Sequence, residues 1–331
     1  MSTAAPRVPW ALLIPAEVQC EYTGVPQGDY FTVLERSIEV AERFPDLFEA
    51  ATGYRQPVAY SAPVTAYEGV AALGGELVFP AQHQPMVRNQ GRILLEPERV
   101  DGLAVPEPWN TPRFLRFVQW RRELGRRFGD AAVGGIAGQE GPVTTAGLLR
   151  GEQFFVDCAM DRSRAHRLLS IVTETLITFT RASREVEGVS PRTVGIADDY
   201  SGLIGPEMWP ELVLPYYRRI IEALGPDGCW MHTELVRREH LPLFRELPLT
   251  GLNFAEDQYL TPRDMMEMGP DVPWGWHILT VSEMQQGKPE SIRCRYRELV
   301  DMGVREVRCE LTVNTPAENV RAFLSIAREL E

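Results

Sequence analysis

From about residue 130 onward, short apolar runs alternate with longer segments whose apolar residues recur at helical spacing. This alternation predicts strand–helix–strand units and a parallel sheet. The runs that predict strands are Ala132 to Gly138, Thr193 to Asp198, Gly228 to Glu234, Leu249 to Ala255, Trp274 to Leu279 and Val304 to Leu311. Two earlier runs, Val8 to Pro15 and Pro57 to Ser61, bring six strands to eight. Because eight parallel strands close a (β/α)8 barrel, we expect an α/β TIM barrel.

The predicted helices begin at clear signals. Proline stands at the first helical position in Gly205-Pro206, Thr261-Pro262 and Thr315-Pro316, where its missing N–H costs nothing. Thr315 with Glu318 also has the spacing of a capping box. The longest predicted helix, near Asp161 to Val186, has no Gly or Pro, and its apolar face is expected to pack in the core.

Residues 74 to 105 interrupt the alternation and predict an N-terminal excursion from the barrel, with a hairpin around Asn89 to Gly91. We expect the excursion to fold over one end of the barrel. No repeat, low-complexity tract or Ser/Gly linker divides the chain, so residues 1–331 are predicted to form a single barrel domain.

The composition of the 331-residue chain excludes some classes of function. A formal charge of -12 disfavours nucleic acid, whose binding depends on clustered Lys and Arg. No apolar stretch approaches the roughly 20 residues of a membrane span, and we expect no signal peptide. The five cysteines are scattered rather than arranged as a disulfide framework, which favours a reducing, cytoplasmic location.

Two segments far apart in the sequence each look like the end of a buried strand. Met231-His232-Thr233-Glu234 ends one run, and Val307-Arg308-Cys309-Glu310 ends another. His232 and Glu234 are two apart, so they face the same side of a strand, and catalytic groups gather at the carboxyl ends of barrel strands. An imidazole, a carboxylate and a thiolate have the composition of a zinc site. The alternatives are a core histidine bonded to Glu234 and a Cys309 that is only a small buried hydrophobe.

Several motifs resemble the uroporphyrinogen decarboxylase superfamily, which includes zinc-dependent corrinoid:thiol methyltransferases. The motifs are Gly141-Pro142-Val143-Thr144, Leu148-Leu149-Arg150-Gly151, Gly195-Ile196-Ala197-Asp198-Asp199-Tyr200, Gly205-Pro206-Glu207-Met208-Trp209, Leu214-Pro215-Tyr216-Tyr217, Gly287-Lys288-Pro289-Glu290-Ser291-Ile292 and Thr315-Pro316-Ala317-Glu318-Asn319-Val320. The similarity covers roughly residues 130 to 331. It implies a (β/α)8 barrel.

The resemblance is closer to the methyltransferase branch than to the true decarboxylases. The decarboxylases have an Arg-rich loop after the first strand and an Asp before Ala-Leu-Gly. The first predicted strand here has no Arg, and Thr65 takes the place of the Asp. The methyltransferases carry His-x-Cys after the fifth strand and a second Cys six residues before a Thr-Pro. His232 and Cys309 match, and Glu234 replaces the first Cys.

This resemblance implies a metal site formed by His232, Glu234 and Cys309. It holds Zn²⁺, although a carboxylate in place of a thiolate also admits another divalent metal. The implied reaction moves a methyl group between a methylcorrinoid and a thiol or other small-molecule substrate. The Asp-x-His-x-x-Gly motif that binds cobalt is absent, so a separate corrinoid protein is the expected partner.

Other residues at predicted strand ends are candidates for catalysis. Asp198 and Asp199 precede Tyr200 and provide acid, base or orienting groups, or else cap the next turn. His277 is a candidate for a substrate contact or a fourth metal ligand. The alternative function is a metal-free decarboxylase or lyase that uses Asp198 on a small carboxylate, and a noncatalytic binding protein would require a dispersed cluster. A homodimer is a further expectation.

Overall fold

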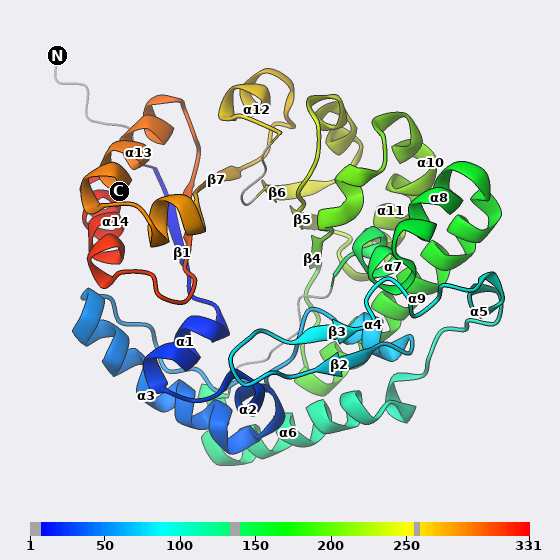
Figure 1. Ribbon diagram of the computed structural model, residues 1–331, viewed down its shortest axis with the longest axis horizontal. Coiled ribbons are helices and arrows are strands. Elements are labelled where there is room, and N and C mark those ends of the chain that lie inside the picture. Colours follow the sequence, from blue (N-terminus) through cyan, green and yellow to red (C-terminus); the bar gives the residue numbers. More distant parts are fainter. Residues whose placement is uncertain (1–7, 133–139, 255–258) are drawn as a thin grey trace.

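A computed structural model describes residues 8–132, 140–254 and 259–331 of the chain (Figure 1). Six parallel strands form one curled sheet in the order β1-β8-β7-β6-β5-β4. These strands are β1 (Trp10–Leu13), β4 (Thr193–Ala197), β5 (Gly228–His232), β6 (Leu249–Asn253), β7 (Trp274–Ile278) and β8 (Val307–Glu310). The prediction of a parallel α/β sheet is confirmed. Each of the six strands lies within a run that the sequence predicted.

The remaining two predicted strands do not form as strands in the described residues. Pro57 to Ser61 contributes a single parallel bridge, from Tyr60 to Ala132, and a second bridge joins Glu140 to Ala197 at the end of β4. Most of the run from Ala132 to Gly138 lies outside the described residues. The observed architecture is therefore a curled six-stranded sheet, with pairing that continues past β4 through isolated bridges.

The helices are arranged around the outside of the curled sheet (Figure 1). They are α1 (Ala16–Thr23), α2 (Gln27–Thr32), α3 (Leu34–Thr52), α4 (Glu68–Ala72), α5 (Pro97–Asp101), α6 (Pro112–Phe128), α7 (Pro142–Arg150), α8 (Glu152–Met160), α9 (Arg162–Glu187), α10 (Trp209–Leu212), α11 (Leu214–Leu224), α12 (Pro262–Met268), α13 (Pro289–Asp301) and α14 (Ala317–Leu330). Short 3-10 turns are η1 (Pro108–Asn110), η2 (Gly129–Ala131), η3 (Asp199–Leu203), η4 (Pro206–Met208) and η5 (Arg238–Glu246), and η6 (Thr280–Gln285) is a π-helical turn. Helix α9 is the long helix that the sequence predicted, and it buries Leu168, Val172 and Leu176 as expected.

One predicted helix start differs from the structure. Helix α14 begins at Ala317 after Pro316, and no side chain caps its first turn, so the capping box expected from Thr315 and Glu318 does not form. The Thr315 hydroxyl instead donates to the carbonyl of Thr312 at 2.7 Å. The turn that precedes the helix therefore competes for the capping hydroxyl.

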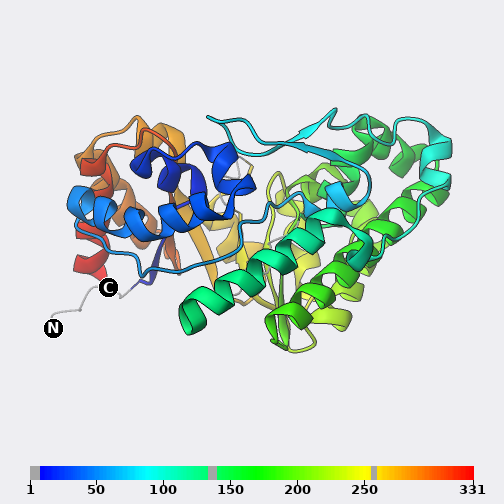
Figure 2. The ribbon, with the colours of Figure 1, turned by 90° about the horizontal axis from the view of Figure 1, so that it is seen from below.

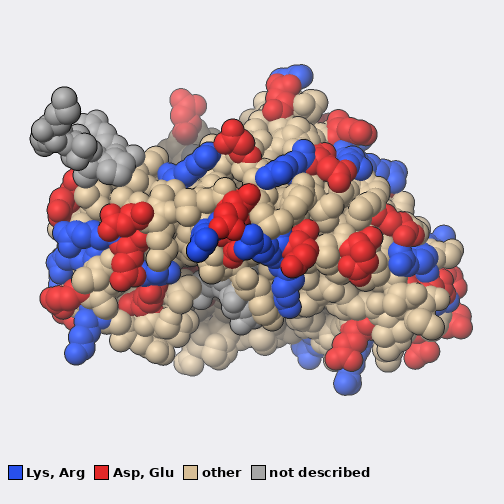
Figure 3. Space-filling view, turned by 90° about the horizontal axis from the view of Figure 1, so that it is seen from above, with Lys and Arg blue, Asp and Glu red and all other residues tan. Residues whose placement is uncertain are grey.

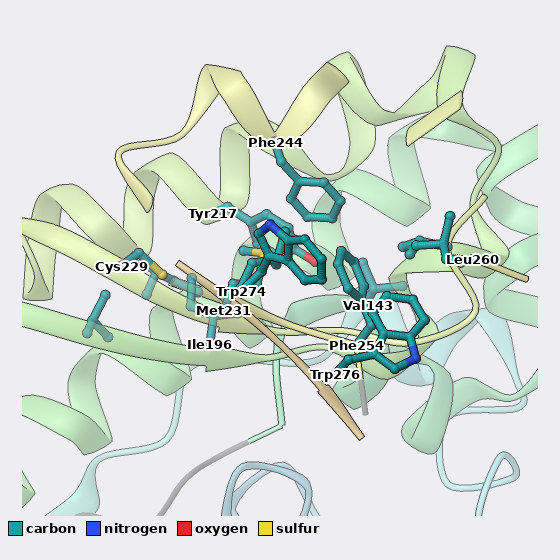
Figure 4. Close-up of a cluster of buried hydrophobic side chains, with 14 of the residues drawn as sticks. Val143, Ile196, Tyr217, Cys229, Met231, Phe244, Phe254, Leu260, Trp274 and Trp276 are labelled. Atoms are coloured by element: carbon teal, nitrogen blue, oxygen red, sulfur yellow. The ribbon is translucent and has the colours of Figure 1, made fainter. Parts of the chain in front are cut away.

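The two faces of the sheet differ in character because side chains alternate along each strand. The face toward the helices is apolar, and Figure 4 shows part of this core, with Ile196, Cys229, Met231 and Trp274 packed below Tyr217 and Phe244. The inner face is small and polar. It carries Gly195, Trp230, His232, Gly251, Asn253, Gly275, His277 and Arg308. The polar side chains at the strand ends therefore lie on the inner face and not in the apolar core between the sheet and the helices.

Glycines on the inner face make room for two large side chains. A Cβ atom added at Gly251 would lie 2.9 Å from the Trp230 ring, and one at Gly275 would lie 2.6 Å from Arg308. The Arg308 guanidinium carbon lies 5.5 Å from the centre of the Trp230 ring, within the range of a cation–π contact. Trp230 therefore packs over Gly251, and Arg308 packs over Gly275, in space that a larger residue would occupy.

The excursion forms a two-stranded antiparallel sheet from β2 (Glu76–Val78) and β3 (Met86–Arg88). The connection between these strands is residues 79–85, so the hairpin does not turn at Asn89 to Gly91 as predicted. That segment follows β3, and Asn89 and Gly91 both have positive φ. The Gly91 N–H donates to the carbonyl of Leu148 at 2.7 Å, which brings this turn onto α7.

The excursion reaches both edges of the sheet. Gln84 donates to the carboxylate of Glu17, which follows edge strand β1. Gln90 donates to the hydroxyl of Tyr200, which follows the other edge strand, β4, at 3.4 Å. In Figure 2 the excursion runs along the upper side of the molecule. It therefore crosses the carboxyl side of the curled sheet.

A buried arginine fixes the end of the excursion. The side chain of Arg150, 2% exposed, donates from Nη1 to the carbonyls of Leu94 and Leu95 at 2.6 and 2.9 Å. Its Nε donates to Asp157 at 2.6 Å, so the guanidinium charge has a buried carboxylate as partner. Arg150 therefore links α7, α8 and the excursion.

The described surface carries mixed charges (Figure 3), and the cysteines are not joined to one another. Figure 3 shows one face on which acidic and basic side chains are interspersed, with no continuous basic surface on that face. None of the five cysteines is in a disulfide bond. Of the helices in the described residues, none combines the length and apolarity that crossing a membrane demands.

Candidate functional site

Polar side chains collect on the inner face where the strands end. His232 is the last residue of β5, Asn253 is the last of β6, and His277 is the next-to-last of β7. His232 pairs in register with Asn253, and His277 pairs with Arg308 of β8. Neighbours in register on parallel strands point to the same side of a sheet. These four side chains therefore face the interior together, at the edge of the sheet where barrel enzymes carry their catalytic groups.

An amide joins the two histidines. His277 Nε2 donates to Asn253 Oδ1 at 3.0 Å, and Asn253 Nδ2 donates to His232 Nδ1 at 3.1 Å. Because an amide oxygen only accepts and an amide nitrogen only donates, this orientation places the proton of each neutral ring on Nε2. His232 therefore presents an N–H to the interior, and His277 keeps a bare Nδ1.

His277 is held neutral. Burial, with the nearby charges of Arg308 and His232, lowers the pKa of His277 to about 3. Its Nδ1 atom is buried and has no hydrogen-bond partner in the described residues. The structure thus places His277 behind Asn253, where it orients the amide.

His232 lies among carboxylates. Its Nε2 atom is 3.1 Å from Asp199 Oδ1 and 3.9 Å from Glu234 Oε1. Burial acts to lower the pKa of His232, but Asp199, with the charges of Glu234 and Glu310, outweighs burial and raises the pKa above its usual value. The Asp199 contact has the distance of an ion pair without the angles of a hydrogen bond, so Asp199 Oδ1, which is buried, accepts no hydrogen bond from the described residues.

Glu140 is a member of this cluster that the sequence analysis missed. It precedes Gly141 and bridges to Ala197 at the end of β4. Burial, and then the charges of Asp199, Asp198 and Glu234, raise the pKa of Glu140 to about 8. Glu140 therefore holds a proton at neutral pH and can donate it. Its position immediately before the Gly141-Pro142 motif, at the end of a predicted strand, was the signal that could have identified it.

The raised pKa of Glu140 predicts a pH-dependent stability. Between its ordinary pKa of 4.5 and about 8, folded Glu140 binds a proton that the unfolded chain has lost, so stability falls as pH rises through this window. Glu140→Gln removes this dependence. We expect the variant to match the wild type near pH 5 and to exceed it by about 2 kcal/mol near pH 8, after allowance for partial exposure. Urea unfolding across pH measures the difference, and a pH-independent difference would contradict the assignment.

Asp198 supports the site rather than facing it. It is fully buried, and it accepts from the backbone N–H groups of Val143 at 3.1 Å and Thr144 at 2.6 Å and from the Tyr217 hydroxyl at 3.0 Å. Burial raises its pKa to about 6, although these hydrogen bonds act to lower it. Asp198 thus satisfies the first N–H groups of α7, which is a capping role across the fold. A Cβ at Gly141 would lie 2.5 Å from Asp198, which accounts for the glycine there.

Tyr200 lies at the side of the site. Its backbone N–H donates to the Thr144 hydroxyl at 2.9 Å, and its own hydroxyl accepts from Gln90. Burial, Glu140 and Asp199 raise the pKa of Tyr200. The tyrosine therefore stays protonated beside the carboxylates, and it connects the α7 motif to the excursion.

The structure does not bring Cys309 to His232 and Glu234. Cys309 pairs in register with Ile278 of β7 and Leu12 of β1, and it is fully buried on the face toward the helices, whereas its neighbours Arg308 and Glu310 face the interior. The offset of Cys309 from Thr315 does not determine which face it occupies. Within residues 8–132, 140–254 and 259–331, no three His, Cys, Asp or Glu side chains are grouped closely enough to hold a metal ion.

Asn253 and Arg308 are interior residues that the sequence analysis did not single out. Asn253 is the last residue of β6, and Arg308 lies within β8. The criterion that selected His232 and His277, a polar residue at a strand end, would have selected Asn253 as well. Arg308 could have been found by its alternation with the buried Val307 and Cys309.

A parallel sheet with titratable side chains at the carboxyl ends of its strands is typical of α/β enzymes. The profile of the uroporphyrinogen decarboxylase (URO-D) family matches residues 65–330. The chain therefore belongs to the uroporphyrinogen decarboxylase family.

Curated relatives include both decarboxylases and a methyltransferase. A uroporphyrinogen decarboxylase of Xanthomonas campestris pv. campestris (strain B100) is 28% identical over 172 residues, which cover 50% of this chain and 46% of that protein. The methylated-thiol–coenzyme M methyltransferase of Methanosarcina mazei is 24% identical over 191 residues, which cover 57% of this chain and 51% of that protein. The chain spans about half the length of the curated relatives it matches.

A solved structure is similar over nearly the whole chain. It is a methyltransferase from Methanosarcina mazei, with a TM-score of 0.73 at 19% sequence identity, and the match covers 98% of this chain and 94% of that one. At this identity the likeness shows the fold.

Proposed function

We propose that this chain is a methyltransferase of the uroporphyrinogen decarboxylase family that moves a methyl group between a corrinoid on a partner protein and a small acceptor such as a thiol. We also propose a complete (β/α)8 barrel, because the isolated bridges Tyr60–Ala132 and Glu140–Ala197 continue the order of the sheet past β4. The similarity to the Methanosarcina mazei proteins supports both statements.

The observation that carries the proposal is the acidic surroundings of His232. Asp199, Glu234 and Glu310 all act on its imidazole with negative charge. A polycarboxylate tetrapyrrole would need several cations at this place, because carboxylates are bound by Arg and Lys, whereas Arg308 is the one Arg or Lys that the six described strands carry on their inner face. Thr65, where the decarboxylases have an Asp, is buried and donates to Glu68 at 3.1 Å. These features favour a neutral or cationic substrate over a porphyrinogen.

We assign roles in proton transfer to several of the described side chains. A thiol acceptor must lose its proton before its sulfur attacks the methyl group. Asp199 Oδ1, buried and without a hydrogen bond among the described residues, is placed to take that proton, beside the Nε2–H of His232. A sulfur–carbon bond then forms as the methyl group leaves the corrinoid, which keeps the bonding electron pair. Asn253 holds the His232 ring, and Glu140 supplies a protonated carboxyl nearby.

The family resemblance implies a metal ion. The described side chains as they are arranged do not form a site for it. Zinc, if bound, would polarise and help deprotonate the acceptor. His232 and Glu234 face the interior, but Cys309 faces the helices, and no group of three ligands is formed in the described residues. The proton-handling roles are therefore assigned to side chains alone.

Methyl transfer is tested directly with the purified full-length chain. Methylcobalamin and a panel of thiols are added, with and without Zn²⁺, and demethylation is followed by absorbance while mass spectrometry identifies the S-methyl product. We expect thiol-dependent demethylation. If no thiol is methylated by either metal-free or zinc-loaded protein, the proposed function is wrong.

Replacing Cys309 tests whether this residue is a metal ligand, as the resemblance implies, or a buried core residue, as its position in β8 indicates. Because its side chain faces the core, Cys309→Ala is expected to keep the zinc content and the activity of the wild type and to lose about 1 kcal/mol of stability. Glu234→Cys is expected to raise zinc affinity, since a thiolate is a softer ligand than a carboxylate. Elemental analysis after dialysis against zinc provides the readout. Loss of zinc from Cys309→Ala would instead show that Cys309 is a ligand.

A further inference from the structure

A pocket lies away from the residues of the candidate site, bounded by α4, α6 and α9. Its lining includes Val64, Glu68, Arg113, Phe114, Arg116, Phe117, Trp120 and Phe179. In Figure 2, α6 is the long helix that crosses the outside of the molecule.

The base of this pocket is aromatic. Phe114, Phe117 and Phe179 are buried, and the rings of Phe114 and Phe179 meet edge to face at 5.9 Å. These residues belong to a small hydrophobic cluster that is separate from the main core. The pocket therefore offers a rigid apolar surface that is suited to a flat or aliphatic group.

One arginine in the wall already has its partner. Arg113 donates from Nε and Nη2 to the two carboxylate oxygens of Glu68, at 2.7 and 2.5 Å. Glu68 Oε1 also accepts from the backbone N–H and the hydroxyl of Thr65. The acceptor capacity of this carboxylate is thus taken up by Arg113 and Thr65.

Arg116 is a half-buried cation with no ion pair or hydrogen bond to the described residues. Its guanidinium carbon lies 4.8 Å from the centre of the Trp120 ring. Burial, and then the charge of Arg113, lower the pKa of Arg116, although the charge of Glu68 acts to raise it. A partly desolvated charge is costly without an opposite charge beside it.

The neighbouring arginines show that acidic partners are plentiful. On the same helix Arg121, Arg126 and Arg127 pair with Glu187, Glu123 and Glu35. The whole chain carries an excess of twelve negative charges. Arg122 has no ion pair among the described residues either, but it is exposed, so water solvates it. Arg116 is therefore the arginine of α6 that lines this pocket without an ion pair to the described residues.

The start of α6 adds to the positive field. The helix has 17 residues and begins at Pro112, and Thr111 of its cap lines the pocket. The N-terminal end of a helix carries partial positive charge and favours anions. Arg116 and the N-terminal end of α6 favour an anionic ligand group at the wall of the pocket. The aromatic base favours an apolar ligand group at its floor.

We propose that this pocket binds a small aromatic carboxylate, with its ring on Phe114, Phe117 and Phe179 and its carboxylate paired with the guanidinium of Arg116. A guanidinium binds a carboxylate through two parallel hydrogen bonds, which explains an arginine at this position. The site is independent of the proposed methyl transfer, because none of its residues contacts His232 or the carboxylates around it.

Calorimetric titration of the full chain with phenylacetate tests the proposal, with the neutral isostere phenylacetamide as the ligand control. We expect saturable binding of the acid at one site and at least tenfold weaker binding of the amide. Arg116→Gln is expected to weaken phenylacetate about tenfold or more. Arg122→Gln, the matched control on the exposed side of the same helix, should bind like the wild type.

One further variant keeps the test decisive. If Arg116→Gln does not fold, Arg116→Lys keeps the charge but loses the planar fork, and it is expected to weaken binding to an intermediate extent. Absence of saturable binding to the wild type, equal binding of the acid and the amide, or equal losses in the Arg116 and Arg122 variants would each overturn the proposal.

Discussion

His232→Ala is expected to reduce methyl transfer by about 100-fold or more, with little loss of folded protein. The imidazole is in the interior, and its Nε2–H lies beside Asp199 Oδ1, the atom placed to take the proton of the acceptor. A positioned proton-transfer group contributes roughly 10² to 10⁴ in rate. Alanine removes the ring and its Nε2–H, which faces the carboxylates of Asp199 and Glu234.

The reaction in the presence of methylcobalamin and the best thiol measures the loss as a change in kcat. His166→Ala is the matched control, because His166 lies on α9 and contacts Tyr216 and Glu211 rather than the site. This variant should stay within twofold of the wild type. Activity of His232→Ala within a factor of about three of the wild type would contradict the assigned role.

Arg150→Ala is expected to lower the free energy of unfolding by about 3–5 kcal/mol. Removal of the guanidinium leaves the buried carboxylate of Asp157 without its main partner, and breaking one half of a buried ion pair typically costs this much. It also leaves the carbonyls of Leu94 and Leu95 without their donor. Both losses act at the junction of α7, α8 and the excursion.

Equilibrium urea unfolding followed by circular dichroism measures this loss. Arg162→Ala provides the control, because Arg162 pairs with Glu211 at the surface, where an ion pair contributes less than about 1 kcal/mol. A loss below about 1 kcal/mol for Arg150→Ala would show that the excursion is held by other contacts.

Hydrophobic periodicity predicted the strands because short apolar runs alternate with longer segments whose apolar residues recur at helical spacing. It placed β4 to β8 within a few residues of their observed bounds. The same information located His232, Glu234 and His277 at strand ends. The connection of β2 and β3 was misplaced, because Asn89 and Gly91 adopt positive φ in a turn that packs on α7 instead of closing the hairpin. Such tertiary contacts leave no mark in local turn chemistry.

The metal triad shows a different limit of sequence reasoning. The resemblance fixed the position of Cys309 along the chain, but a one-residue change of phase decides whether a strand residue points inward or outward. In the structure Arg308 and Glu310 occupy the inward phase and Cys309 the outward one. Asn253 was overlooked for a related reason: its role depends on two histidines from neighbouring strands, and the pairing that joins them appears only in the folded sheet.

The contacts of the excursion set a length limit on the entrance to the site. Gln84 is held at the β1 side and Gln90 at the β4 side, and six peptide units separate them. A fully extended chain spans at most about 3.6 Å per residue, so the Cα atoms of Gln84 and Gln90 are at most about 22 Å apart. While both contacts persist, this length also limits how far Glu17 can lie from Tyr200. The excursion therefore acts as a tether of fixed maximum length between the two sides of the entrance. A partner that must bring a large cofactor to His232 has to release one of these two glutamines or approach past the tether.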